Sequence, residues 1–276
     1  MLILKNILYG LISGITEFLP VSSDAHQALL RYLFGIGTKA PLQELLVHIG
    51  VLFAILSGCR ESLFRLYREH KFGSGYRRRK VRFSDSASYY DLRLLKTASV
   101  CLIAGLLLRF ATSYMESNLL LLLAFFLFNG LVLLLAEHTS RGNRDSRTMS
   151  GLDGIVMGVL GALSAFPGIS RTGMILSYAS VRGADSKNAV NWAVLLGIPA
   201  MLFSLVYDLI GIVSVGIGGA SAVDVLGYFI SGITAFAGGY LGISVLRVGL
   251  HDSGFSRFAY YSIGAALFSF ILYLIT

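Results

Sequence analysis

One short segment decides the fold of this chain: Glu17-Phe18-Leu19-Pro20-Val21-Ser22-Ser23-Asp24-Ala25-His26. It lies between two apolar runs, yet it carries two carboxylates, two hydroxyls and an imidazole, which is too polar for a helix that faces lipid. Pro20 disfavours helical backbone at Leu19 and interrupts any helix that runs through it. Ser22, Ser23 and Asp24 are good N-cap residues for a second helix. The segment therefore predicts two short helices that meet at a polar break.

A helix N-terminus at this break would expose unpaired backbone N–H groups at the positive end of the helix dipole. Such an end is a natural binding site for an anion. Glu17 and His26 would lie beside the bound anion. The break is therefore the first candidate for a functional site.

The composition places the chain in a membrane. It has 276 residues, of which 55% are hydrophobic and only 14% charged, and its mean hydropathy is +0.72. A soluble fold of this size cannot bury so much apolar surface. Several apolar runs approach the roughly 20 residues that a spanning helix needs, and they lack the alternating pattern of a β-barrel. We therefore predict an all-α, polytopic integral membrane protein with one domain over residues 1–276.

The net charge of +8 could also suggest a nucleic-acid-binding protein. The Lys and Arg residues flank apolar runs, however, as they do in membrane proteins whose orientation is set by positive charge. We therefore expect membrane lipids, and no nucleic acid, as partners of the basic segments.

The apolar runs predict six spanning helices and two shorter helix pairs. The spans are expected at about 41–57, 91–112, 117–137, 187–210, 223–246 and 256–275. The first pair, 2–17 and 22–35, flanks the polar break, and the second pair, 151–165 and 170–182, flanks residues 166–171. We predict that both pairs are re-entrant hairpins, because broken backbone is tolerated at membrane depth only where it is buried in protein or lines a wet cavity.

The basic loops set the expected orientation in the membrane. The loops at 58–90, 138–150 and 247–257 fall on one side only if each short pair re-enters without crossing. By the positive-inside rule this side is cytoplasmic. Both termini are then external, and Asp208 and Asp224 are expected to bound a loop on the external side.

The two halves of the chain, about 1–137 and 138–276, resemble each other. Pro167 lies 147 residues after Pro20, and each half has one hairpin and three spans. An odd number of spans forces the second half to be inverted. Inverted repeats with broken helices are typical of transporters, in which the ligand binds where the breaks converge. We therefore expect the two breaks to meet.

Two motifs, residues 17–26 and Pro167-Gly168-Ile169-Ser170-Arg171, resemble those of a known enzyme family. They are similar to the undecaprenyl-pyrophosphate phosphatases of the bacterial cytoplasmic (inner) membrane, the integral-membrane family tied to bacitracin resistance. The resemblance covers essentially the whole chain in order and hydropathy. It implies that a polyprenyl pyrophosphate lipid is hydrolysed to the monophosphate, which recycles the lipid carrier of peptidoglycan and cell-wall precursors. It also implies a divalent cation, magnesium or calcium, and leaves a homodimer open.

Four residues are predicted to be catalytic: Glu17, Ser23, His26 and Arg171. Arg171 is a permanent cation whose planar fork suits phosphate oxygens, so we expect it to clamp the pyrophosphate. The resemblance leaves open whether Ser23 or His26 is the nucleophile. A serine needs a base, whereas an imidazole can attack phosphorus or serve as that base. Glu17 would hold the metal or orient His26.

Four more residues are predicted to bind the substrate: Ser22, Gly168, Ser170 and Thr172. They lie at the two helix breaks, where backbone N–H groups are available to phosphate oxygens. His48 is interpreted differently, because a lone histidine on an apolar helix face is usually a hydrogen-bonded core residue.

The chain departs from the family pattern at three positions. Ser13 stands where the family has a glutamate one helical turn before Glu17, and Ile175 stands where it has a threonine. Asp24 occupies a position that is usually small and uncharged. We predict that Asp24 supplies the missing carboxylate and binds the metal together with Glu17. If the lost side chains are essential, the alternative function is a polyprenyl-phosphate transporter or flippase with weak or no hydrolysis.

Overall fold

The structure is a computed structural model that describes residues 2–35, 40–76, 87–139, 142–216, 220–252 and 254–275. Within these ranges the chain forms helices joined by turns, and no β-strand. The α-helices are α1 (Leu2–Phe18), α2 (Ser23–Phe34), α3 (Pro41–Gly58), α4 (Arg60–Tyr76), α5 (Ala87–Leu106), α6 (Arg109–Thr112), α7 (Leu119–Glu137), α8 (Gly151–Ala162), α9 (Arg171–Val181), α10 (Ser186–Leu195), α11 (Gly197–Val215), α12 (Ala222–Asp252) and α13 (Ser256–Ile275). Three short 3₁₀ helices accompany them in the same ranges: η2 (Ser113–Ser117), η3 (Ser146–Thr148) and η4 (Leu163–Ala165).

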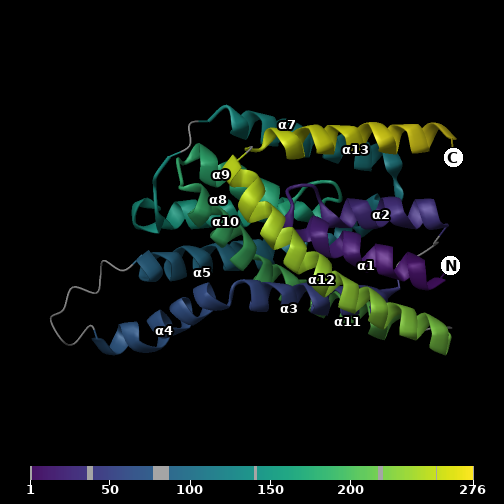
Figure 1. The fold of residues 1–276 in the computed structure, drawn as a ribbon, viewed down its shortest axis with the longest axis horizontal. Helices are drawn as coiled ribbons and strands as arrows, with labels where there is room; N and C mark the ends of the chain where they lie inside the picture. Colours follow the sequence, from purple (N-terminus) through teal and green to yellow (C-terminus); the bar gives the residue numbers. More distant parts are fainter. Residues whose placement is uncertain are drawn as a thin grey trace.

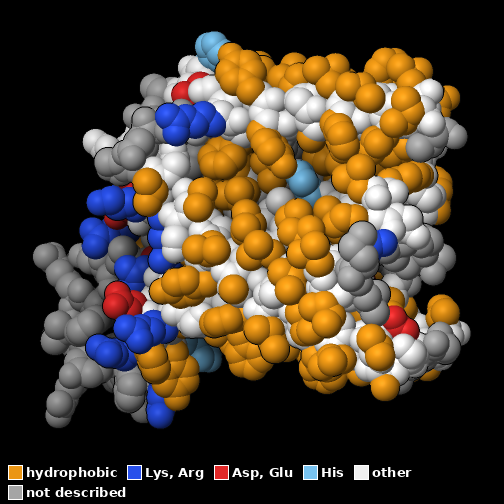
Figure 2. Space-filling model, turned by 45° about the vertical axis from the view of Figure 1, so that its right-hand side comes forward, with side chains coloured by type: hydrophobic (Ala, Val, Ile, Leu, Met, Phe, Trp, Pro, Cys, Tyr) orange, Lys and Arg blue, Asp and Glu red, His pale blue; other side chains and the backbone are white. Residues whose placement is uncertain are grey.

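Six helical segments in the described ranges are long and apolar enough to cross a membrane: Pro41–Gly58, Tyr89–Ser117, Leu119–Glu137, Ser186–Val215, Ala222–Gly249 and Ser256–Ile275. They coincide with the six predicted spans, which confirms the all-α polytopic fold. Figure 2 shows hydrophobic side chains over most of the visible surface of the helices. Such a surface is expected where helices face lipid, so the chain is a multi-pass membrane protein.

The two short helix pairs are hairpins whose open ends are held together. Lys5 Nζ on α1 donates a 2.7 Å hydrogen bond to the carbonyl of Phe34 at the end of α2. In the second hairpin, Arg182 Nε after α9 donates a 2.6 Å hydrogen bond to Asp153 Oδ1 at the start of α8. The first hairpin opens at the end of the bundle that holds both chain termini (Figure 1). That the hairpins re-enter the membrane, and that the halves form an inverted repeat, stay predictions.

Positive side chains gather at the opposite end of the bundle, where α4 meets the start of α5 (Figures 1 and 2). The exposed Lys and Arg residues on the described parts of α4 and α5 are Arg60, Arg65, Arg68, Lys71, Arg93 and Lys96. The remainder of this basic loop, residues 77–86, lies outside the described residues. The distribution is the one that the positive-inside rule expects of a membrane protein.

One boundary differs from its prediction. Helix α11 continues through Asp208 to Val215, whereas Asp208 was expected to begin a loop. Its carboxylate is buried and accepts a 2.6 Å hydrogen bond from His48 Nδ1 on α3. A carboxylate is tolerated within an apolar helix where a buried partner faces it. Asp224 does lie at a helix start, because it occupies the first turn of α12.

Helix α12 crosses the bundle diagonally and packs against α1 and α3 (Figure 1). Glycine makes this contact close. A Cβ atom on Gly10 would lie 2.1 Å from the carbonyl oxygen of Ser231, and one on Gly50 would lie 2.1 Å from that of Gly232. Small residues allow helix backbones to approach closely in membrane proteins. The contact fixes α1, which ends at the polar break, within the bundle.

Candidate functional site

The two helix breaks meet inside the bundle, as expected. The backbone N–H of Gly168 donates a 3.0 Å hydrogen bond to Ser22 Oγ, and Ser170 Oγ donates a 3.2 Å hydrogen bond to the carbonyl of Leu19. Asn129 on α7 contributes to the same junction, because its Oδ1 accepts a 3.0 Å hydrogen bond from the N–H of Ser170. Residues far apart in the sequence therefore form one buried junction.

The backbone at this junction is unusual. Ser22, the N-cap of α2, has a φ of 67°, and it is the one non-glycine residue with positive φ in the described ranges. Such a conformation costs of order 1–3 kcal/mol and persists where neighbouring groups hold it, here the N–H of Gly168. Gly168 has a φ of 115°, and a Cβ atom there would lie 2.6 Å from Cβ of Phe125. Only glycine fits that position.

A cavity lies beside the junction. It is lined by six residues that the sequence predicts to be functional: Glu17, Ser22, Ser23, Asp24, Ser170 and Arg171. It is also lined by residues of other helices, among them His48, Arg109, Ser164, Met201 and Ser204. Most of these side chains are polar although the cavity lies within an apolar bundle. Such a cavity suits a polar or charged group of a ligand.

Arg171 presents a buried guanidinium to this cavity. The residue is 5% exposed, and its Nη2 lies 3.3 Å from Glu17 Oε1. Yet Nε, Nη1 and Nη2 have no hydrogen-bond partner in the part of the chain that the structure describes. Gly197 makes room for the group, because a Cβ atom there would lie 3.0 Å from Nη1. Buried donors are normally paired, so the N–H groups of this guanidinium are available to a ligand that brings oxygen acceptors.

Ser23 is the first residue of α2, and it lines the cavity. Its Oγ donates a 3.1 Å hydrogen bond to the carbonyl of Ser13 on α1. The side chain of Ser13 is itself fully buried and donates a 2.6 Å hydrogen bond to the carbonyl of Tyr9. Ser13 thus contributes a backbone acceptor next to the cavity and no carboxylate.

His26 does not line the cavity. Its Nδ1 lies 2.7 Å from the carbonyl oxygen of Ser22, and its Nε2 lies 2.8 Å from the hydroxyl of Tyr261 on α13. The two rings also stack, with their centroids 5.6 Å apart. Both ring nitrogens are therefore engaged, and the imidazole holds α2 against α13. This placement favours Ser23 over His26 as a nucleophile.

Thr172 and Ile175 do not line the cavity either. Thr172 Oγ1 donates a 3.3 Å hydrogen bond to the carbonyl of Glu17, so Thr172 joins the two hairpins. Ile175 is fully buried and faces Gly161, whose added Cβ would lie 3.1 Å from Ile175 Cδ1. Thr172 therefore supports the junction between the hairpins, whereas Ile175 packs between the two helices of the second hairpin.

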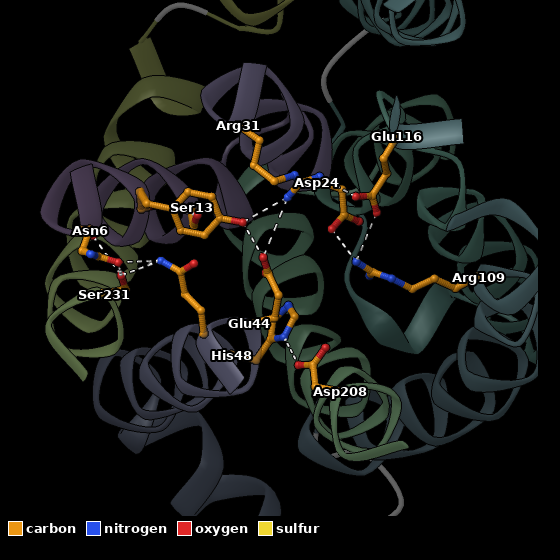
Figure 3. Close-up of polar contacts among 12 residues, drawn as sticks. Asn6, Ser13, Asp24, Arg31, Glu44, His48, Arg109, Glu116, Asp208 and Ser231 are labelled. Atoms are coloured by element: carbon orange, nitrogen blue, oxygen red, sulfur yellow. Dashed lines mark hydrogen bonds and ion pairs between the residues drawn. The ribbon is translucent and has the colours of Figure 1, made fainter. Parts of the chain in front are cut away.

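Two ionisable residues that line the cavity, Arg109 and His48, were not predicted to be functional. Arg109 on α6 donates a 2.5 Å hydrogen bond from Nη2 to Asp24 Oδ1 (Figure 3). His48 is buried and hydrogen-bonded to Asp208, as expected of a core histidine, but it also lines the cavity. Arg109 and Asp208 each interrupt an apolar run, and a charge at such a position is by itself a signal of function in a membrane protein.

A series of buried charges leads away from the cavity (Figure 3). Arg109 Nη2 lies 4.0 Å from Glu116 Oε1, and Glu116 Oε2 accepts a 2.7 Å hydrogen bond from Arg31 Nη2. Arg31 Nη1 lies 3.8 Å from Glu44 Oε1 and donates a 3.1 Å hydrogen bond to the hydroxyl of Tyr9. Each arginine lies between carboxylates. Buried charges are tolerated in a bundle interior when they are paired in this way.

Two carboxylates that could contact a metal ion line the cavity, Glu17 before Pro20 and Asp24 after it. Nowhere in the described residues do three His, Cys, Asp or Glu side chains group closely enough to hold a metal ion by themselves. Mg²⁺ is usually bound by one or two carboxylates together with water and substrate phosphates. The two carboxylates therefore fit a cation that shares its ligands with a phosphate.

A family model for the bacitracin resistance protein BacA matches residues 6–268, which is nearly the whole chain. The chain belongs to the BacA family. Three relatives illustrate its place in the family, and each is named undecaprenyl-diphosphatase. The protein of Carboxydothermus hydrogenoformans is 29% identical over 93% of this chain and 92% of its own length. That of Alkaliphilus metalliredigens is 30% identical over 84% and 86%, and that of Synechococcus elongatus is 32% identical over 79% and 75%. The BacA match includes both helix breaks and Arg109.

Proposed function

We propose that this BacA-family protein is an undecaprenyl-diphosphatase, a membrane phosphatase that hydrolyses undecaprenyl diphosphate to the monophosphate and so recycles the cell-wall lipid carrier. The observation that carries the proposal is the buried guanidinium of Arg171, which lines a polar cavity and has no hydrogen-bond partner among the described residues. A phosphate group brings the acceptors and the negative charge that this group needs. The names of the relatives favour hydrolysis over transport.

In this proposal Ser23 is the nucleophile. Its Oγ attacks the terminal phosphorus of the bound diphosphate, and the bond from that phosphorus to the bridging oxygen breaks, so that undecaprenyl monophosphate leaves. Water then releases the phosphate from the serine. Arg171 binds oxygens of the reacting group and stabilises the negative charge that develops on them. The serine proton needs an acceptor within the cavity. The lining side chains of that kind are Glu17, Asp24 and His48.

We also propose that a divalent cation, Mg²⁺ or Ca²⁺, binds with the substrate between Glu17 and Asp24. When bound, it would neutralise negative charge on the phosphate oxygens. Asp24 would then replace the carboxylate that the family has at the position of Ser13. The support for this proposal is that both carboxylates line the cavity that contains Arg171.

The proposed location is the bacterial inner membrane, with the basic end of the bundle in the cytoplasm and both termini outside. Two features support this orientation. Lys and Arg side chains gather at the end where α4 meets α5, and both termini lie at the other end (Figures 1 and 2). Cytoplasmic segments of membrane proteins carry the excess of Lys and Arg.

The purified protein should release phosphate from undecaprenyl diphosphate. We expect the rate to fall by about tenfold or more when EDTA removes divalent cations, and to recover when Mg²⁺ or Ca²⁺ is added back. Phosphate release in detergent micelles or nanodiscs measures both effects. A folded protein that binds the lipid but releases no phosphate with either metal would contradict the proposal and favour a transporter.

A further inference from the structure

A second arginine, Arg109, lines the same cavity as Arg171. The two come from different halves of the chain, and both are buried. Each also faces a carboxylate of the first helix break: Glu17 lies at the end of α1 beside Arg171, and Asp24 lies at the start of α2 beside Arg109. The cavity therefore contains two arginine–carboxylate pairs.

Arg109 keeps hydrogen-bond donors for a ligand. Its hydrogen bond and ion pairs within the described residues all use Nη2, which lies 2.5 Å from Asp24 Oδ1 and 4.0 Å from Glu116 Oε1. A guanidinium has five N–H donors in a rigid planar fork. Those on Nε and Nη1 make no hydrogen bond to any residue that the structure describes.

Three elements fix the position of this guanidinium. Asp24 contacts it from α2, and Glu116 contacts it from η2. The ring of Tyr207 on α11 lies against it, with 5.4 Å between Cζ of Arg109 and the ring centroid. A cation over an aromatic face is stabilised by the ring, more strongly where water is excluded. The side chain is therefore held in place before any ligand binds.

We propose that Arg109 and Arg171 each bind one phosphate group of a diphosphate, so that the cavity selects a diphosphate lipid over a monophosphate lipid. A diphosphate has two anionic groups joined by one bridging oxygen, and each can accept hydrogen bonds from one guanidinium. Asp24 acts as a positioning residue for Arg109. The assignment of the lipid as substrate rests on the proposed function, but the selectivity for two phosphate groups does not. A monophosphate product would keep only one arginine contact, which favours its release.

The test measures binding of two lipids that cannot be hydrolysed, farnesyl methylenediphosphonate and farnesyl phosphonate, to the full-length protein in Mg²⁺. The native chain should prefer the diphosphonate. Arg109→Gln should lower the diphosphonate affinity by about tenfold to a hundredfold, the effect of losing charge-assisted hydrogen bonds. It should change the affinity for the phosphonate little, so the preference should nearly disappear.

Arg31→Gln is the matched control. Arg31 is also a buried arginine bonded to Glu116, but it does not line the cavity. This variant should keep the preference for the diphosphonate. An equal loss of preference in both variants would show that Arg109 acts only through the series of buried charges, and a full preference in Arg109→Gln would overturn the proposal directly.

A second variant covers the case in which Arg109→Gln does not fold. Arg109→Lys keeps a positive charge opposite Asp24 and Glu116 but loses the planar fork, so the preference should fall partway. An unchanged preference in this variant would also overturn the proposal. Phosphate release by the native chain is measured separately. Selective binding without release would refute the proposed function alone, and release without selective binding would refute the inference alone.

Discussion

Replacing Ser23 with alanine should lower the rate of phosphate release from undecaprenyl diphosphate by about 10³-fold or more, because the variant lacks the hydroxyl that is proposed to attack phosphorus. The sequence left either Ser23 or His26 open as the nucleophile, and of these two residues Ser23 lines the cavity. The change also removes the hydrogen bond to the carbonyl of Ser13, which is worth only about 1 kcal/mol. The variant should therefore fold, and its rate at saturating lipid should report the chemical step.

His26→Gln is the comparison for this variant. His26 lies on the same helix, and both of its nitrogens are engaged by Ser22 and Tyr261. Its loss should lower the temperature of unfolding and leave phosphate release within the same order of magnitude. If His26→Gln abolished release while Ser23→Ala retained it, the imidazole would be the nucleophile and the assignment of Ser23 would be wrong.

Replacing Arg171 with lysine should lower kcat/KM by about tenfold to a hundredfold, which corresponds to about 1–3 kcal/mol. Lysine keeps the positive charge but loses the fork that binds two phosphate oxygens at once. The buried position strengthens the effect, because little water can reach the site to replace the lost donors. Steady-state kinetics of phosphate release measures the change.

Arg182→Lys provides the control for this substitution. Arg182 follows the same helix, but it is bonded to Asp153 at the open end of the hairpin and does not line the cavity. It should leave kcat/KM unchanged. An unchanged value for Arg171→Lys as well would mean that the Arg171 guanidinium does not contact the phosphate.

The sequence predicts the fold well because its main signals are local. Apolar runs of spanning length predict the six spans directly, and Pro20 and Pro167 mark the two interruptions. The junction of the breaks is less local. It was expected from the likeness of the two halves, and the hydrogen bond between Ser22 and Gly168 bears it out.

The orientation of individual side chains was harder to predict. Asp24 and His26 are two residues apart, so they lie about 200° apart around the helix axis. The side of α2 that carries Asp24 faces the cavity, and the other side carries His26 toward Tyr261. His26 is close to the cavity residues in sequence, but its side chain points away from the cavity.

The pairing of distant charges could not be predicted either. Arg109 meets Asp24, and His48 meets Asp208, only because of how helices α2, α3, α6 and α11 are rotated and packed. Neither contact has a local sequence signal. The sequence shows that a charge within an apolar run needs a partner, but the partner is identified only in the folded bundle.

Binding of the diphosphate at the junction of the two helix breaks is tested most directly by an experimental structure of the Ser23→Ala variant with undecaprenyl diphosphate. The diphosphate should lie in the cavity between the breaks, within hydrogen-bond distance of the Arg171 guanidinium. A headgroup bound elsewhere on the bundle, with Arg171 still lacking a ligand, would contradict the site.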